Sequence, residues 1–145
     1  MQLHATSPSA RPRRVRSTRS AARRAPAAPR NEHAEQAALV GWARLHEHRL
    51  PGLALLFAIP NGGRRDAVTG ARLKAEGVKP GVPDLFLPVA RRSFHGLFIE
   101  LKAPGGAASP EQRGWIARLR QAGYSAEVCF GWEAAALTLT HYLED

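Results

Sequence analysis

Three charged residues occur inside apolar, strand-like stretches near the middle of the chain. Asp84 begins the stretch "DLFLPV", and Glu100 and Lys102 lie near the end of "GLFIELK". Burying a charge without a partner is costly, so charged residues in such stretches need a chemical reason. Two carboxylates and a lysine can hold a divalent cation and stabilise the charge that develops on a phosphate during hydrolysis.

The spacing of these residues predicts that they meet. Side chains alternate across a strand, so Glu100 and Lys102 share one face. If 83–89 and 96–103 pair as a hairpin that turns near Arg92, Asp84 lies opposite Glu100. Two carboxylates at such a short distance repel each other unless a positive charge lies between them. A hard cation such as Mg²⁺ with oxygen ligands is one solution.

Each residue also has a structural explanation. Glu100 and Lys102 could be an ordinary outward-facing pair on a half-exposed strand, and Asp84, which follows Pro83, could be a turn residue at a strand start. Their combination is more informative, because a Pro-Asp, a strand, a turn and a Glu-x-Lys in this order resemble the PD-(D/E)xK nuclease signature.

The elements that must position these residues alternate between helical and strand patterns. Asn31 can cap a helix, and Ser109, Pro110 and Gln112 form the start of another, with a capping box. The expected order is a helix from 31, a buried strand at 53–59, a short helix at 66–76, strands at 83–89 and 96–103, a helix from 109, a strand at 124–130 and a helix at 132–143. This predicts an α/β domain with a mixed central sheet.

Charge divides the chain into two parts. Of the 21 Lys and Arg residues, eight arginines lie in residues 1–30, which contain no acid; residues 31–145 hold the other 13 and all 12 Asp and Glu. We therefore predict a disordered Arg-rich arm at 1–30 and a folded domain at 31–145. The arm is interpretable either as a solvated tail or as an electrostatic contact for phosphate backbones.

Compartment and membrane signals are few. The single cysteine, Cys129, excludes an intramolecular disulfide. No apolar run approaches the roughly 18 residues of a membrane span, and the arm has no apolar core of a secretory signal. These features predict no membrane partner and a cytoplasmic location, in a bacterial or phage-infected cell.

Residues around the charged cluster extend the resemblance. The segments "EHAEQAALVGWA", "IPNGG", "LKAEGVKPGVPDL", "GLFIELK" and "SPEQRGWIARLRQAGY" resemble, in that order, the VRR-NUC family, especially its small stand-alone phage and bacterial members. The resemblance covers residues 31–145. It implies a restriction-endonuclease-like core of helix, three strands, helix and strand, in which the short helix at 66–76 is an insertion after the first strand.

The resemblance also implies roles for individual residues. Asp84 and Glu100 correspond to metal ligands, with the Leu101 carbonyl as a candidate third ligand for Mg²⁺ or Mn²⁺. Lys102 corresponds to the residue that positions the attacking water or stabilises the phosphoryl charge.

Three further assignments each have an open alternative. Gln112 matches a recurrent glutamine beside the site, but it also fits the capping box with Ser109. The family's first-helix acid falls on Glu32, and Glu35, one turn later, is the alternative. The turn "PNGG" at 60–63 fits either a close approach to DNA or a simple tight turn.

These residues predict an Mg²⁺- or Mn²⁺-dependent deoxyribonuclease. One form of this prediction is an endonuclease that selects branched or structured DNA. A homodimer would suit cleavage of a two-fold junction. The alternative is a non-catalytic nucleic-acid-binding module on a nuclease fold. Trp42, Trp115 and Trp132 are expected in the core rather than stacked on bases.

Overall fold

The structure is a computed structural model that describes residues 31–61 and 66–144. The predicted arm at 1–30 lies outside the described residues. Along the described chain the elements are α1 (Glu32–His46), η1 (Pro51–Leu55), β1 (Phe57–Ala58), α2 (Ala67–Ala75), β2 (Leu85–Leu87), β3 (Leu97–Lys102), α3 (Pro110–Gln121), β4 (Ser125–Phe130) and α4 (Trp132–Glu144). This is the predicted α/β order, with α2 inserted after the first strand.

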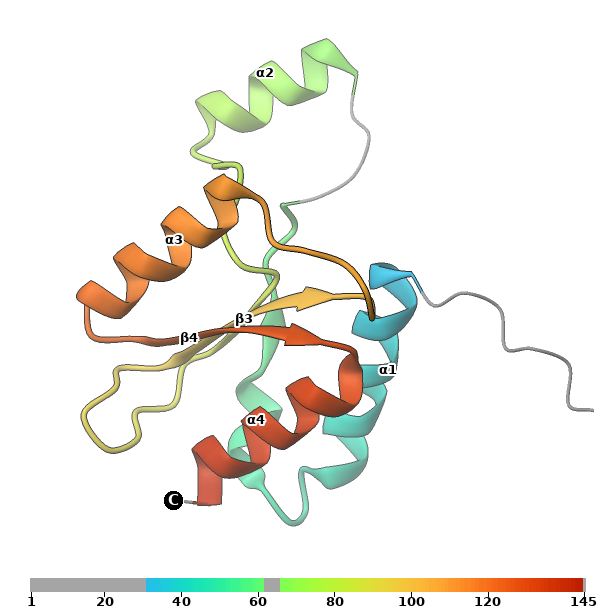
Figure 1. The fold of residues 1–145 in the computed structure, drawn as a ribbon, viewed down its shortest axis with the longest axis vertical. Helices are drawn as coiled ribbons and strands as arrows, with labels where there is room; N and C mark the ends of the chain where they lie inside the picture. The colour runs from blue at the N-terminus through green and yellow to red at the C-terminus, as the bar shows by residue number, and fades with distance from the viewer. Residues whose placement is uncertain (1–30, 62–65, 145) are drawn as a thin grey trace, which may run out of the picture.

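The strands of the described residues form one mixed sheet in the order β1-β2-β3-β4. The β1–β2 and β2–β3 pairs are antiparallel, and the β3–β4 pair is parallel, with α3 as its connection. The helices α1 and α4 cover one face of the sheet, and α3 lies on the other (Figure 1). The predicted fold class is therefore confirmed.

The hairpin register places the two acids as the sequence predicts. Leu85 pairs with Ile99 and Leu87 with Leu97, so Asp84, one residue before β2, comes opposite Glu100. The carbonyl of Asp84 also accepts a hydrogen bond from Ile59 N at 2.7 Å. Asp84 is thus held through its backbone carbonyl by the residue that follows β1.

One hydrophobic core holds this register. Leu85, Leu87, Leu97, Ile99 and Leu101 are almost fully buried, and they pack against apolar residues of α1 and α4: Leu39, Ala43, Ala135 and Leu139. A slip of one residue would turn all of these side chains to the other face. Packing therefore fixes which face of β3 carries Glu100 and Lys102.

The helix starts follow their predicted caps. Asn31 accepts a hydrogen bond from Ala34 N at 2.8 Å and begins α1. Ser109 and Gln112 form both bonds of the capping box at the start of α3, with Pro110 at the first helical position. These bonds satisfy backbone N–H groups that have no partner inside the helix.

The prediction of a buried strand at 53–59 was largely wrong. Residues Pro51–Leu55 form a 3-10 helix, and only Phe57–Ala58 is a strand, with both side chains exposed. Pro51 presets the backbone dihedral of the first helical position. A short apolar run does not distinguish a strand from a helical turn by itself, and Leu53 is the only residue of the 3-10 helix that is buried.

The tryptophans divide into two groups. Trp42 and Trp132 pack against the core, as predicted, but Trp115 does not belong to it. Trp115 is half-buried, and its indole Nε1 donates to the carbonyl of Pro80 at 2.9 Å. The core prediction therefore fails for Trp115, because its polar edge has a partner at the surface.

The helix α2 stands apart from the rest of the domain (Figure 1). It buries none of its residues and begins at Asp66, whose side chain caps it by accepting from Thr69 N at 2.9 Å. Within 31–61 and 66–144, every helix is too short or too polar to cross a bilayer.

Candidate active site

The carboxylate of Asp84 is anchored to the backbone of β3. Its Oδ2 accepts a hydrogen bond from Leu101 N at 2.8 Å. Leu101 lies between Glu100 and Lys102, so this bond fixes Asp84 beside both of them. The anchored carboxylate sits where the two strands of the hairpin separate, as the sequence predicts.

Lys102 links two acids from different elements. Its Nζ lies 2.8 Å from Glu100 Oε1 on β3 and 3.2 Å from Glu32 Oε1 at the start of α1. The side chains of Glu100 and Lys102 are only 1% and 7% exposed, whereas that of Glu32 is 55% exposed. The explanation of Glu100 and Lys102 as an outward-facing surface pair is therefore wrong.

Gln112 makes the capping-box bond and also lies beside the charged cluster, so its position fits both alternatives. Its Oε1 accepts from Ser109 N at 2.7 Å, which closes the capping box, and its Nε2 donates to Glu100 Oε1 at 2.6 Å. The cap fixes which end of the amide faces the sheet. The start of α3 is therefore tied directly to Glu100.

The structure brings Glu32, and not Glu35, to the charged cluster. Glu35 is buried, and its Oε2 accepts from Trp132 N, the first residue of α4, at 2.7 Å. A carboxylate at that position stabilises the positive end of a helix. Glu35, the alternative first-helix acid, therefore already has a structural partner at the start of α4.

Burial and mutual repulsion shape the acidity of the cluster. Burial raises the pKa of Glu100 to about 7, and the charge of Asp84 adds to this, against the hydrogen bond from Lys102. Burial also raises the pKa of Asp84, although the Leu101 N–H and the charge of Lys102 oppose it. Burial disfavours the charged form of Lys102, but its bonds to Glu100 and Glu32 outweigh that effect and raise its pKa.

A cavity of about 440 Å³ lies beside Asp84. Besides Glu32, Asp84 and Leu101, it is lined by His33, Gln36, Ala58, Ile59, Pro60 and Asn61. Sequence reasoning did not assign His33 or Gln36 to the site. The sequence feature that could have identified them is helical spacing, because Gln36 lies one turn after Glu32 and His33 on α1.

The "PNGG" segment reaches this cavity through its first two residues. Pro60 and Asn61 line it, and Asn61 Nδ2 donates to Val82 O at 2.9 Å. That bond ties the end of β1 to the segment that leads to Asp84. Gly62 and Gly63 lie outside the described residues.

The oxygen atoms of the cluster suit a hard divalent cation. Glu100 Oε2 is buried and has no hydrogen-bond partner among the described residues, and the carboxylate of Asp84 is adjacent. In 31–61 and 66–144 no three His, Cys, Asp or Glu side chains gather as a metal site. A cation here would thus use two carboxylates with backbone and water oxygens, which is a ligand set that Mg²⁺ accepts.

Comparisons with known proteins find one family. The VRR-NUC domain model matches residues 17–132, so the match starts before the predicted domain boundary at 31 and ends at the first residue of α4. One similar solved structure is a VRR_NUC domain protein with 28% sequence identity and a TM-score of 0.69, aligned over 81% of this chain and 91% of that chain. No curated protein matches the chain.

Proposed function

The chain belongs to the VRR-NUC family, a nuclease-type family, and from that premise we propose that it is a metal-dependent deoxyribonuclease. The observation that carries the proposal is the convergence of Asp84, Glu100 and Lys102 at one buried end of the β2–β3 hairpin. Two carboxylates and a lysine are the groups that hydrolysis of a phosphodiester needs.

Asp84 and Glu100, with the Leu101 carbonyl, are the proposed ligands of Mg²⁺ or Mn²⁺. When bound, the cation would lower the pKa of a water molecule and polarise the phosphoryl oxygens. The Leu101 N–H holds Asp84 in place at 2.8 Å. Gln112 holds Glu100 at 2.6 Å, so neither carboxylate has to be reorganised.

Lys102 supplies the positive charge that belongs to the protein itself. Its Nζ is held between Glu100 and Glu32 at 2.8 and 3.2 Å, and its raised pKa keeps it protonated. In this position the ammonium group can orient a water molecule and stabilise charge on the phosphoryl group. Glu32, through its contact with Lys102, is assigned a positioning role.

The direct test is cleavage of labelled DNA by the full chain. Single-stranded, duplex, flap and four-way-junction DNAs are each incubated with Mg²⁺, with Mn²⁺ and with EDTA. We expect cleavage with either metal and none with EDTA. Comparison of the four DNAs also measures any preference for branched structures.

The Asp84→Asn variant is the matched control, because it removes a charge and changes little volume. It should bind DNA and fail to cleave it. Binding without cleavage by the wild type, with both metals and all four DNAs, would instead identify a non-catalytic nucleic-acid-binding module. Full activity of Asp84→Asn would place the catalytic site elsewhere.

A further inference from the structure

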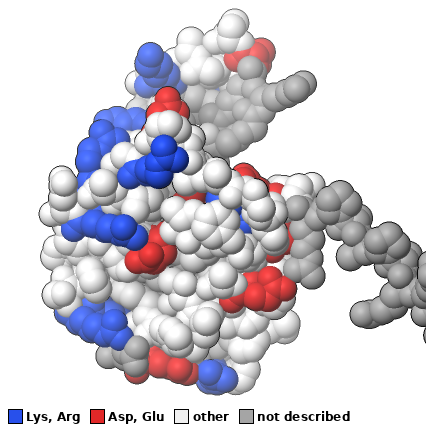
Figure 2. Space-filling view, in the orientation of Figure 1, with Lys and Arg blue, Asp and Glu red and all other residues white. Residues whose placement is uncertain are grey.

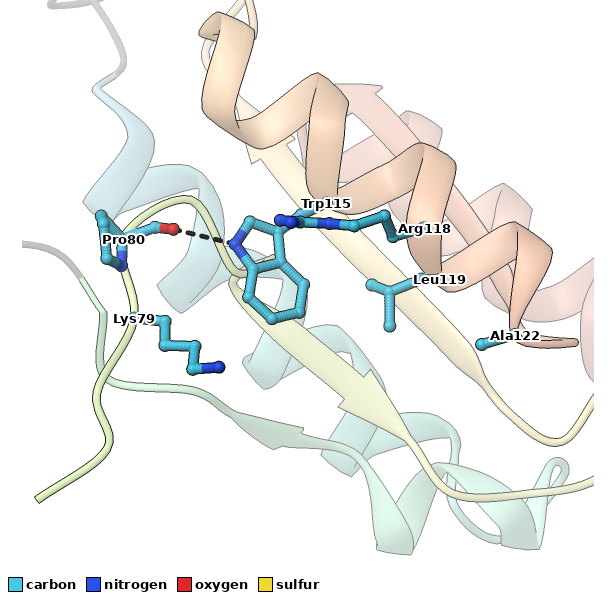
Figure 3. Close-up of a pocket in the computed structure, with 6 residues that line it drawn as sticks. All are labelled: Lys79, Pro80, Trp115, Arg118, Leu119 and Ala122. Carbon is cyan, nitrogen blue, oxygen red and sulfur yellow. Dashed lines mark hydrogen bonds between the residues drawn. The ribbon is translucent and has the colours of Figure 1, made fainter.

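A second pocket, of about 520 Å³, lies between α3 and the segment before β2 (Figure 3). It is lined by Lys79 and Pro80 from the segment before β2, and by Trp115, Arg118, Leu119 and Ala122 from α3. These lining residues comprise two cations and no acid. Their charge favours an anionic ligand.

The two walls of the pocket are held together by a side-chain hydrogen bond and a close backbone approach. Trp115 Nε1 donates to Pro80 O at 2.9 Å. The next residue, Gly81, has φ +82°, and a Cβ atom there would lie 3.0 Å from the backbone carbon of Glu111. The segment can approach α3 this closely because Gly81 has no side chain.

Arg118 is already oriented toward this pocket. Its guanidinium carbon lies 4.6 Å from the centre of the Trp115 ring, a cation–π arrangement that restricts the long side chain. Figure 3 shows Arg118 and Lys79 beside the same indole, one from each wall. An anionic ligand would therefore meet Arg118 with little reorganisation of that side chain, with Lys79 on the opposite wall.

The surroundings of the pocket are also basic. Lys and Arg side chains gather over α3 and beside α2 in the view of Figure 2. The basic residues of these helices are Arg113, Arg118 and Arg120 on α3 and Arg72 and Lys74 on α2, of which Arg120 pairs with Glu127 and Arg72 with Glu76. A polyanion longer than one phosphate would find further positive charge on either side of the pocket.

The helix α3 connects the pocket to the candidate active site. Gln112, which contacts Glu100, lies on the same helix six residues before Arg118. That separation is about 9 Å along the axis at about 1.5 Å per residue. A strand of B-DNA advances about 3.4 Å per nucleotide, so the offset corresponds to roughly two or three nucleotides.

We propose that this pocket binds a backbone phosphate of the DNA strand a few nucleotides from the bond that is cleaved. Lys79 and Arg118 hold the phosphate, and Trp115, Leu119 and Ala122 provide an apolar surface for the adjoining deoxyribose. The proposal rests on the proposed function, because it takes DNA as the substrate. It adds a subsite that none of the metal-site residues forms.

The test compares two double variants of the full chain. Lys79→Ala with Arg118→Ala removes both cations of the pocket, whereas Arg44→Ala with Arg49→Ala removes the same charge from exposed positions of α1 and its C-terminal end. Binding to a labelled 20-nucleotide single strand and to its duplex is measured by fluorescence anisotropy in EDTA over a range of salt concentrations. Melting curves establish that both variants are folded.

We expect only the pocket variant to lose affinity. The slope of log affinity against log salt should fall by roughly 0.7 for each lost contact with the single strand and roughly 0.9 with the duplex. Equal losses of affinity in both double variants would show that the pocket contributes only as part of the general positive charge of the surface. Wild-type affinity and slope in the pocket variant would overturn the proposal.

A second measurement separates the pocket from the catalytic chemistry. Bis(p-nitrophenyl) phosphate is too small to occupy the candidate active site and the pocket together. If the chain hydrolyses it, the pocket variant should do so at the wild-type rate while its kcat/KM on DNA falls. If the wild type cleaves neither substrate, the proposed function fails, but the binding comparison still decides whether the pocket holds DNA.

Discussion

Gln112 donates a hydrogen bond from Nε2 to Glu100 Oε1 at 2.6 Å, while Oε1 of the same amide accepts from Ser109 N at 2.7 Å. Because one end of the amide is fixed by the helix cap, the other end must present N–H groups to the carboxylate. The local chemistry that starts α3 therefore also orients Glu100. A helix cap and a candidate catalytic site share one side chain.

Two substitutions can distinguish the capping role of Gln112 from its contact with Glu100. Ser109→Ala removes the Ser109 side chain that caps Gln112 N and should lower the free energy of unfolding by about 1 kcal/mol. It leaves the contact between Gln112 and Glu100 and should therefore retain most of the cleavage rate. Gln112→Ala should cause a similar loss of stability and also reduce kcat. Urea unfolding and DNA cleavage are measured on both proteins; equal cleavage rates would mean that Gln112 acts only as a cap.

Metal binding should be visible as a change in stability. A cation that binds only the folded protein stabilises it by about 2.7 kcal/mol at a hundredfold excess over Kd. Millimolar Mg²⁺ or Mn²⁺ should therefore raise the Tm of the wild type above its value in EDTA. Asp84→Asn should melt higher than the wild type in EDTA, since it loses a repelling charge, and gain little from metal. Identical responses of the two proteins would show that Asp84 is not a ligand.

Removal of Lys102 should affect both rate and stability. Loss of one electrostatic donor to a developing charge typically costs roughly 10²- to 10³-fold in kcat, and we expect Lys102→Ala to fall in that range. Its free energy of unfolding should fall by up to about 3 kcal/mol, because Glu100 loses its buried partner. Glu32→Gln is the comparison: Glu32 is 55% exposed, so its loss should cost less than about 1 kcal/mol. If both variants unfold alike in urea, the burial of the Lys102–Glu100 pair contributes no stability.

Stability without metal should depend on pH through Glu100. Its pKa is raised from 4.5 to about 7, so the folded protein binds this proton more tightly than the unfolded chain does. The free energy of unfolding should therefore fall as pH rises from about 4.5 to about 7, and this contribution should then level off. Asp84, whose pKa is also raised, contributes in the same direction. Glu100→Gln should show a weaker dependence in melting curves in EDTA; coincident curves would contradict the raised pKa.

The role of the basic arm can be measured in two steps. The family match starts at residue 17, so deletion of 2–16 leaves it intact, whereas deletion of 2–30 removes part of it. Each step removes four arginines. If they contact phosphates, the salt-dependence slope on duplex DNA should fall by roughly 0.9 per contact. An unchanged slope after both deletions would identify a solvated tail.

Much of the fold could be predicted from local chemistry. The caps at Asn31 and Ser109 and the alternation along β3 are short-range signals, and each is present as predicted. The hairpin register followed from symmetry about Arg92, which places Asp84 opposite Glu100. Those signals sufficed to bring the acids together because the site lies on two strands that are neighbours in sequence.

The features that the sequence left open or predicted wrongly depend on long-range contacts. The choice between Glu32 and Glu35 depends on where α4 begins, since Trp132 N takes Glu35 as its partner. The position of Trp115 depends on the path of residues 79–81 across α3. Helical periodicity gives Trp115 an apolar face but does not indicate what covers that face.

The β2–β3 register also constrains how the length of related chains can vary. Because side chains alternate, a single-residue insertion in β3 between Leu97 and Glu100 would reverse the faces of Glu100 and Lys102 relative to Leu97, and one in β2 would do the same for Asp84 relative to Leu87. Insertions in the turn between Leu87 and Leu97 leave the strand pairs intact. Among homologues that keep the charged cluster, gaps should therefore accumulate in that turn. Within the strands, length changes should be absent or should appear as a bulge that restores the alternation.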